Sequence, residues 1–267
     1  MGLLSFMREV SGAPCYRRSL SATAKYGYAK WVLSRFREND PEKFLQGLGV
    51  RASRTLRGYE QWRPELERVV HDVQQASDGQ GGVSSADGLV LYGLVRALEP
   101  DYVVETGVAA GVSTSYIGAG LIDNGHGHLF SIELPPAEEL ALVCADGSRY
   151  IWQDRGVGWA IPASIRAGLG GRHRLILRDV RKALAELLRE IPYVDIFFHD
   201  DLHAPEHMLW EYSLVWPRIR PGGVLVSDDS NYGWIQFCRE LRRGEEGFPN
   251  LDRLTALRKG LRTAPSE

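Results

Sequence analysis

The segment Tyr102–Thr114, YVVETGVAAGVST, most constrains how this chain can fold. It opens with a short β-branched apolar run, which is typical of a buried strand in a parallel sheet. Glu105 follows, and then Gly107 and Gly111, whose lack of a side chain lets the backbone approach a ligand closely. A hydroxyl residue such as Ser113 can satisfy the amides that open the next helix. The segment therefore predicts a strand, a ligand-binding turn at the carboxyl edge of a sheet, and a helix.

Several nucleotide-binding folds share this layout, so the spacing of the glycines matters. A dinucleotide site requires Gly-x-Gly-x-x-Gly, but Ala109 and Val112 stand at the second and third glycine positions. A phosphate loop requires Gly-Lys-Ser/Thr, which the sequence lacks. The segment instead resembles motif I of the class I S-adenosylmethionine (SAM) methyltransferases, Asp/Glu-x-Gly-x-x-x-Gly; a glycine turn of an ordinary α/β protein is the alternative. The resemblance implies that SAM binds at Glu105, Gly107, Gly111 and Ser113.

Length and composition limit the other possibilities. A chain of 267 residues with 44% hydrophobic residues can form one α/β domain with an extension. Its 32 basic and 34 acidic residues give a formal charge of -2, which does not favour binding to nucleic acid. Cys15, Cys144 and Cys238 have no metal-ligand spacing and suit a reducing compartment. With no apolar run long enough to span a membrane, we expect a cytoplasmic protein without a membrane partner.

The N-terminal part differs in character from the rest. Residues 1–84 are charged, aromatic and mostly compatible with helix, and Pro64–Ala76 has apolar residues at helical spacing, with Pro64 suited to the first turn. Ser77–Ser85 is rich in Gly, Ser and Gln and marks a boundary. We therefore predict an N-terminal helical extension over 1–84 and a SAM-binding domain over 85–267. The aromatic residues of the extension pack in a core or form a lid or a homo-oligomer contact.

Strands alternate with helical or mixed segments after this boundary. A helix is expected over Asp87–Leu98, ending before Pro100. The expected strands are Tyr102–Thr106, Leu129–Glu133, Arg174–Leu177, Asp195–His199 and Gly223–Ser227. This alternation predicts an α/β fold with a doubly wound, mostly parallel, Rossmann-like sheet of the methyltransferase type. The charged C-terminal part, 244–267, is short for a full pair of terminal strands, so these strands are abbreviated or supplied differently.

Three further features are candidates for ligand contacts. Glu133 ends the second strand, where a carboxylate can accept both hydroxyls of a ribose. Asp179 follows the third strand and either accepts the adenine amino group or caps the next helix. The long aromatic connection Gly147–Gly171, which includes Trp159, is expected to form a wall of the active site.

Acidic clusters end the next two strands. His199-Asp200-Asp201-Leu202-His203 follows the fourth strand, and Ser227-Asp228-Asp229-Ser230 follows the fifth. Parallel strands send their carboxyl ends to one edge, so these carboxylates should converge beside the glycine turn. Their repulsion would be relieved by a cation such as Mg²⁺, which prefers oxygen ligands. The alternative is that these residues are helix caps and solvated loop residues.

The segments around these clusters, VDIFFHDDLH and WPRIRPGGVLVSDD, resemble the macrocin and cephalosporin O-methyltransferase-like branch of the class I enzymes. The related catechol-type enzymes imply a Mg²⁺ site at Asp200, Asp228 and Asp229, with Asp200 also facing the cofactor. Their general base, a lysine, corresponds to His203, and a histidine is chemically competent for that role. Trp159, Tyr232 and Trp234 are the candidates for substrate contact.

Together these features predict a SAM-dependent, Mg²⁺-dependent O-methyltransferase that methylates a hydroxyl of a small molecule. A specialised metabolite or sugar-bearing intermediate, as in antibiotic biosynthesis, is the expected acceptor class. A metal-independent methyltransferase with His203 as base is one alternative. The others are a nucleotide-dependent oxidoreductase and a non-catalytic SAM-binding module.

Overall fold

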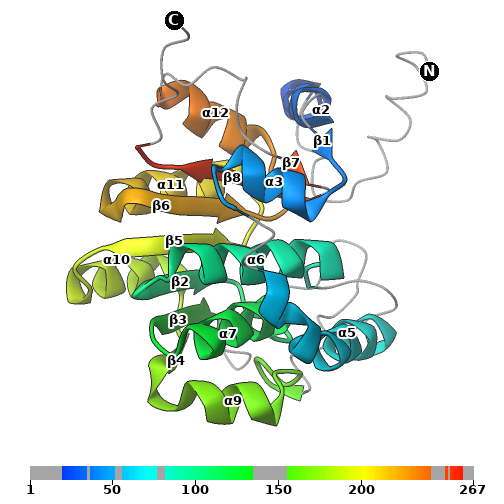
Figure 1. The fold of residues 1–267 in the computed structure, drawn as a ribbon. Helices are drawn as coiled ribbons and strands as arrows, with labels where there is room; N and C mark the ends of the chain where they lie inside the picture. Colours follow the sequence, from blue (N-terminus) through cyan, green and yellow to red (C-terminus); the bar gives the residue numbers. More distant parts are fainter. Residues whose placement is uncertain are drawn as a thin grey trace, which may run out of the picture.

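The computed structural model describes residues 20–34, 37–51, 56–76, 82–134, 155–241, 250–251 and 253–260. These residues form an 8-stranded sheet with the strand order β1-β7-β8-β6-β5-β2-β3-β4, covered by helices on both faces (Figure 1). Within the same ranges, none of the helices combines the length and apolar character that crossing a membrane requires. The α/β, doubly wound fold class predicted from the sequence is confirmed.

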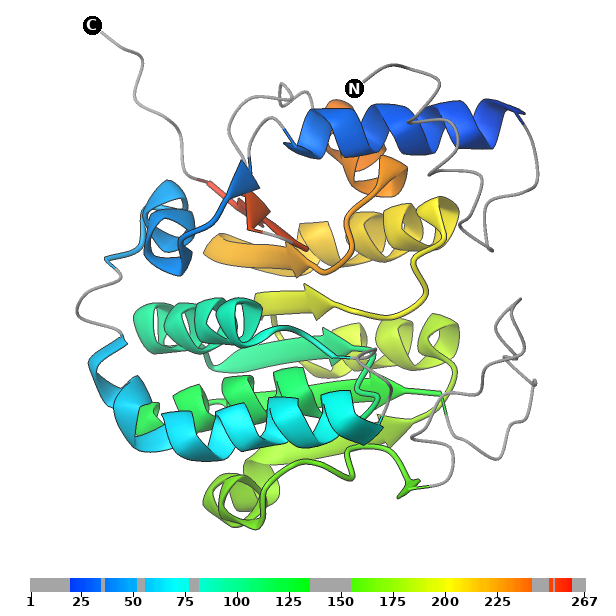
Figure 2. The same cartoon turned by 90° about the vertical axis from the view of Figure 1, so that its right-hand side faces the viewer.

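The central strands are parallel, and the antiparallel pairings involve β8. The strands are β1 (Arg37–Glu38), β2 (Tyr102–Thr106), β3 (His128–Glu133), β4 (His173–Leu177), β5 (Val194–His199), β6 (Ile219–Ser227), β7 (Asn250–Leu251) and β8 (Leu254–Arg258). β4, β3, β2, β5 and β6 pair in parallel, whereas β8 runs antiparallel to β6 and β7. The parallel strands therefore bring their carboxyl ends to one edge (Figure 2).

Alternate strand residues pack against two separate helical layers. Val103 and Ile196 belong to the apolar cluster on one face, whereas their neighbours Val104 and Phe197 belong to the cluster on the other. The first layer contains α3 (Pro41–Gly47), α5 (Tyr59–Ala76), α6 (Ser85–Leu98), α7 (Val112–Asn124) and α9 (Ala163–Leu169). The second contains α2 (Leu20–Ser34), α10 (Val180–Glu190), α11 (Pro205–Val215) and α12 (Tyr232–Glu240). Short 3-10 turns are η1 (Leu56–Gly58), η2 (Gly170–Arg172) and η3 (Trp216–Arg218).

Two helix starts differ in how well the sequence predicts them. α6 has Ser84 as its N-cap, with the Ser84 hydroxyl accepting from the Asp87 amide at 3.1 Å, close to the predicted start. The prediction that α5 begins near Pro64 is wrong, because the helix already begins at Tyr59. Tyr59 is buried, with its ring 5.6 Å from that of Tyr92. Burial of this aromatic residue stabilises the turns before Pro64 despite the proline.

The N-terminal helix α2 packs beside the carboxyl end of β6. The Arg239 guanidinium on α12 donates to the Tyr28 hydroxyl at 2.7 Å, and Lys25 lies 5.1 Å from the centre of the Tyr232 ring. The Asn250 amide on β7 donates to the Leu33 carbonyl at 2.7 Å. α2 is thereby fastened to α12 and β7, above the strand ends (Figure 2).

The C-terminal strands are abbreviated, and β1 completes this edge of the sheet. β7 has 2 residues and β8 has 5, and β1, which comes from the N-terminal part, pairs with β7 in parallel. Parts of the predicted boundary Ser77–Ser85 and of the connection Gly147–Gly171 lie outside the described residues, including Tyr150 and Trp152.

Candidate active site

Glu105 organises the glycine turn from inside the protein. Its side chain is completely buried and accepts hydrogen bonds from the hydroxyls of Ser113 (2.5 Å), Thr114 (2.8 Å) and Ser131 (2.7 Å). Burial raises the pKa of this carboxyl, whereas the three donors oppose that rise. Glu105 and Ser113 therefore connect β2, β3 and the start of α7 beneath the turn.

Gly107 and Gly111 let two other segments pass directly against the turn. Gly107 has φ +83°, and a Cβ there would overlap the backbone carbonyl of Asp200, which begins the loop after β5. Gly111 has φ +93°, and a Cβ there would overlap the Ile161 side chain. Only glycine combines these left-handed conformations with such close approach. The two glycines thus determine how near the site loops come to one another.

Glu133 faces the same turn from the end of β3. Its Oε2 accepts from the amides of Val108 and Ala109, both at 2.8 Å, and its Oε1 accepts from the Leu134 amide at 2.8 Å. Burial raises the pKa of Glu133, and these three amides counteract part of the rise. The carboxylate is thus placed beside the turn, and its contact with a ribose stays a prediction.

Trp159 and Asp179 occupy different positions at the sheet edge. The amides beside Trp159, those of Gly158 and Ala160, donate to the carbonyls of Ala109 and Ala110 at 2.8 and 2.9 Å, so this segment lies along the glycine turn. Asp179 caps α10, with its Oδ1 accepting from the Arg181 amide at 2.7 Å. Of the two roles left open for Asp179, capping is therefore present.

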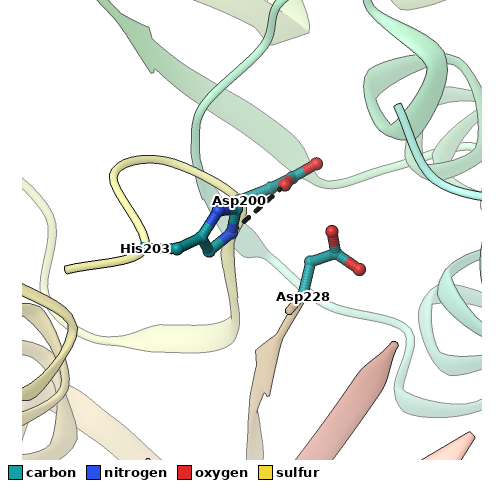
Figure 3. A group of neighbouring side chains, drawn as sticks. All are labelled: Asp200, His203 and Asp228. Atoms are coloured by element: carbon teal, nitrogen blue, oxygen red, sulfur yellow. Dashed lines mark ion pairs between the residues drawn. The ribbon is translucent and has the colours of Figure 1, made fainter. Parts of the chain in front are cut away.

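Asp200, His203 and Asp228 converge at the ends of β5 and β6 (Figure 3). Each offers a ligand atom within 4.8 Å of the others, and His203 Nε2 lies 3.7 Å from Asp200 Oδ1. Asp228 is completely buried, and its Oδ1 accepts no hydrogen bond from the described residues. The Asn231 side chain donates to the His203 carbonyl at 2.8 Å and so holds the loop that carries His203.

The charges of this cluster are strongly perturbed. Burial, followed by the neighbouring Asp228, raises the pKa of Asp200 well above its usual range. Burial raises the pKa of Asp228 to about 7, although Arg253 opposes the rise. Burial and the nearby His199 lower the pKa of His203 to about 4. His203 is therefore neutral near pH 7 and able to accept a proton.

Arg253 is a residue of the candidate site that sequence reasoning missed. It precedes β8 and forms ion pairs with both aspartates that follow β6: Nη2 lies 2.5 Å from Asp228 Oδ2, and Nε lies 2.8 Å from Asp229 Oδ1. Asp229 is thus engaged by a cation, and its side chain is 46% exposed. The antiparallel pairing of β8 with β6 brings Arg253 here, and no local motif around Arg253 signals this contact.

The donor set suits a divalent cation at Asp200 and Asp228 better than at Asp229. Oδ1 of Asp228 accepts no hydrogen bond from the described residues, and a second carboxyl, that of Asp200, lies in the same cluster; carboxylate oxygens are the ligands that Mg²⁺ prefers. Both oxygens of Asp229, by contrast, accept hydrogen bonds from Arg253. The three aspartates predicted to act together are therefore unequal.

A cavity of about 440 Å³ lies between α2 and this cluster. The wall on the cluster side includes His203, Asp229 and Arg253, and the wall on the α2 side includes Lys30 and Leu33. Of the two aromatic candidates on α12, Tyr232 is half-buried under Lys25. Trp234 is completely buried, with its ring 5.6 Å from that of Tyr212 in the core.

The sheet order, the glycine turn and the acids at the strand ends define the class I methyltransferase fold. Residues 104–230 match the family model described as a methyltransferase domain. The chain therefore contains a segment similar to a methyltransferase domain, within a fold of the methyltransferase type.

Solved structures resemble the chain at the level of fold. The O-methyltransferase from Bacillus cereus, in complex with SAH, has a TM-score of 0.50 at 19% identity, over 73% of this chain and 91% of that chain. The SAH-bound methyltransferase PaMTH1 from Podospora anserina has a TM-score of 0.51 at 16% identity, over 73% of this chain and 87% of that chain. No curated protein sequence matches significantly.

Proposed function

We propose that the enzyme transfers the methyl group of SAM to a hydroxyl of a small molecule, with His203 as the general base. The observation that carries this proposal is the position of His203. It belongs both to the cluster with Asp200 and Asp228 and to the wall of the 440 Å³ cavity. A hydroxyl in that cavity could reach the imidazole next to the carboxyl ends of the strands.

The chain's own residues supply proton transfer and positioning. His203 is neutral because burial and His199 hold its pKa at about 4, so it can take the hydroxyl proton. Asp200 Oδ1, 3.7 Å away, would stabilise the imidazolium when this carboxyl is ionised. SAM, when bound, supplies an activated methyl group. Much of the rate would come from aligning the acceptor oxygen with that group.

The proposed cofactor site lies on the glycine turn. Gly107 and Gly111 would allow close approach of the cofactor, and Glu133 would accept from its ribose. Glu105 and Ser113 would support this site from beneath, since their side chains bond to each other at 2.5 Å. The SAH bound to the Bacillus cereus O-methyltransferase supports both the cofactor and transfer to oxygen in a related fold.

The acceptor proposal rests on the cavity and on the sequence resemblance. Lys30 and Arg37 bring positive charge to the α2 side of the cavity, and Leu33 brings apolar surface. These walls suit a small molecule with polar substituents, such as a specialised metabolite or a sugar-bearing intermediate. The resemblance to the macrocin-like branch supports a role in antibiotic biosynthesis in the cytoplasm. Trp31 on α2 is 53% exposed and supports a homo-oligomer contact through the N-terminal helices.

Mg²⁺ forms part of the leading proposal. Asp200 and Asp228 would hold it, because the buried Oδ1 of Asp228 accepts no hydrogen bond from the described residues. A bound Mg²⁺ would lower the pKa of the acceptor hydroxyl. Asp229 would join only if it left Arg253.

Arg253 favours a second candidate, a metal-independent methyltransferase. Its positively charged guanidinium already forms ion pairs with the carboxylates of Asp228 and Asp229. In this candidate His203 remains the base, and Arg253 balances the aspartates in place of a metal.

The test uses purified enzyme, labelled SAM and a panel of phenols and glycosides. We expect SAH, and not NAD, to raise the melting temperature, and His203→Ala to reduce kcat by about 10²- to 10⁴-fold with SAH affinity unchanged. Full turnover by His203→Ala would remove the base assignment, and stabilisation by NAD alone would favour an oxidoreductase. Activity that survives EDTA and does not rise on Mg²⁺ add-back would select the metal-independent candidate.

A further inference from the structure

A second cluster of potential ligands joins the loop that carries His203 to α11. Asp201 follows β5, and His207 and Glu211 are one helical turn apart on α11. Each of the three offers one ligand atom within 4.8 Å of the others, and none of them belongs to the cluster of Asp200, His203 and Asp228. We propose that Asp201, His207 and Glu211 form a separate site for a divalent transition-metal ion, with Zn²⁺ as the best geometric match.

The interatomic distances suit a shared metal better than direct hydrogen bonds. His207 Nε2 lies 3.3 Å from Asp201 Oδ2 and 3.4 Å from Glu211 Oε1. Charge-assisted N–H···O bonds are shorter, about 2.7–2.9 Å. Ligand atoms bound tetrahedrally at about 2.0–2.1 Å lie about 3.3 Å apart, as expected around Zn²⁺. The two distances from His207 therefore match ligands around one ion, and the third, between Asp201 and Glu211, is within 4.8 Å.

Burial makes these polar atoms costly unless something binds them. His207 is 4% exposed and Glu211 is completely buried. Neither ring nitrogen of His207 nor Oε1 of Glu211 makes a hydrogen bond with the described residues. With a neutral imidazole, the carboxylates of Asp201 and Glu211 leave two negative charges, which a divalent ion would neutralise. A divalent ion would thus take the place of the positive charge that a protonated His207 supplies in the metal-free protein.

Glu211 is oriented by contacts to its other oxygen. Its Oε2 lies 2.6 Å from His199 Nδ1 and accepts from the Thr106 hydroxyl at 2.9 Å. These bonds fix the carboxylate and leave Oε1 directed at His207. Partners of this kind commonly orient metal-binding carboxylates in proteins. Asp201, whose side chain is 28% exposed, provides a path from solvent.

An ion at this site would fasten the loop 200–204 to α11. The ion would hold Asp201 in place. Asp201 directly follows Asp200, and the backbone carbonyl of Asp200 packs against Gly107. The site would thus reinforce the region next to the proposed active site without contributing a group to the reaction. It does not depend on which acceptor, or which reaction, the enzyme uses.

The test titrates EDTA-treated, dialysed protein with Zn²⁺ by calorimetry, and with Co²⁺ while recording its visible spectrum. We expect one tight Zn²⁺ equivalent and the intense visible bands of tetrahedral Co²⁺. His207→Gln should weaken Zn²⁺ at least about 100-fold. Two control variants should bind Zn²⁺ as tightly as the wild type. Asp228→Asn alters the other cluster, and His126→Gln replaces an exposed histidine.

Three results would overturn the inference: no Zn²⁺ binding by the wild-type protein, binding by His207→Gln equal to wild type, or a weak octahedral Co²⁺ spectrum. Circular dichroism checks that His207→Gln folds. If it does not, Asp201→Asn replaces it, because this ligand lies nearest the surface, and undiminished Zn²⁺ affinity in that variant would equally overturn the inference. No arm of the test uses SAM or an acceptor, so its outcome is separate from that of the proposed function.

Discussion

Arg253 and Asp228 form an ion pair at the carboxyl end of β6, with Nη2 2.5 Å from Oδ2. The side chain of Asp228 is completely buried, whereas that of Arg253 is 37% exposed. The pair engages Oδ2 of Asp228, and its Oδ1 accepts no hydrogen bond from the described residues. This single contact separates the two candidate forms of the proposed reaction.

Removing Arg253 should strengthen Mg²⁺ binding if the metal belongs to the enzyme. We expect Arg253→Gln to lower the Mg²⁺ Kd by about tenfold or more, because the competing cation is lost and Asp229 is released. Isothermal titration with Mg²⁺ measures this. Arg258→Gln is the matched control, since that guanidinium donates to the carbonyls of Gly222 and Leu48 instead. An unchanged Mg²⁺ Kd together with lost turnover would support the metal-independent candidate.

Gly107 should be intolerant of any side chain. Gly107→Ala combines φ +83° with overlap of the Asp200 carbonyl, so the loop after β5 must move away from the turn. We expect SAH affinity to fall by about tenfold or more. Gly125→Ala is the control: its φ is +76°, but a Cβ there meets nothing within 4 Å. It should lose about 1 kcal/mol of stability and keep SAH binding.

Glu105 should contribute to stability through its three hydroxyl donors. Glu105→Ala leaves buried hydroxyls of Ser113, Thr114 and Ser131 without this acceptor and opens a cavity. We expect a loss of about 3 kcal/mol or more in the free energy of unfolding, measured by urea denaturation. Ser131→Ala removes one donor only and should cost about 1 kcal/mol. Equal stability of Glu105→Ala and wild type would contradict this role.

His207 should make the metal-free protein less stable at alkaline pH. Burial alone would lower its pKa, but the nearby carboxylates of Asp201 and Glu211, 3.3 and 3.4 Å from Nε2, raise it to about 9, above the ordinary value of 6.5. A raised folded-state pKa stabilises the protein fully below about pH 6.5, and this contribution is lost as the pH rises through about 9. In EDTA-treated, metal-free protein we expect the free energy of unfolding to fall by an amount on the order of 2–3 kcal/mol between pH 6 and pH 10.

Urea denaturation at both pH values, with wild type compared with His207→Gln, isolates this contribution. The other titrating groups are common to both proteins, so the difference between them reports His207. A stability difference that does not change with pH would contradict the expected linkage.

Local sequence was sufficient for most of the sheet. β2 was predicted at its observed bounds, and β3, β4 and β5 each begin one residue before the prediction, because β-branched and aromatic runs bounded by turns mark buried strands. β6 begins at Ile219, ahead of the predicted Gly223, because the Pro-Gly-Gly sequence suggests a turn and yet the chain stays paired to β5 and β8. The pair β1 and β7 could not be predicted, since each has 2 residues and pairs with a distant partner.

Part of the candidate site could also be placed from the sequence. The residues at strand ends, Asp200 and Asp228, could be placed together because parallel strands share one carboxyl edge. Trp234 was harder to assign, because an aromatic residue in an amphipathic helix can face either the core or a cavity, and only packing against Tyr212 shows that it lies in the core.

By itself, the sequence predicted the methyltransferase-type α/β fold, through the glycine turn of Tyr102–Thr114 and the acids that end β5 and β6. These features are encoded over a few neighbouring residues, so periodicity and spacing reveal them. Only the tertiary structure decided that Arg253 neutralises Asp228 and Asp229, and that His207 faces Asp201 and Glu211. Those contacts depend on how a strand and a helix pack in three dimensions, and burial and charge act only once that packing exists.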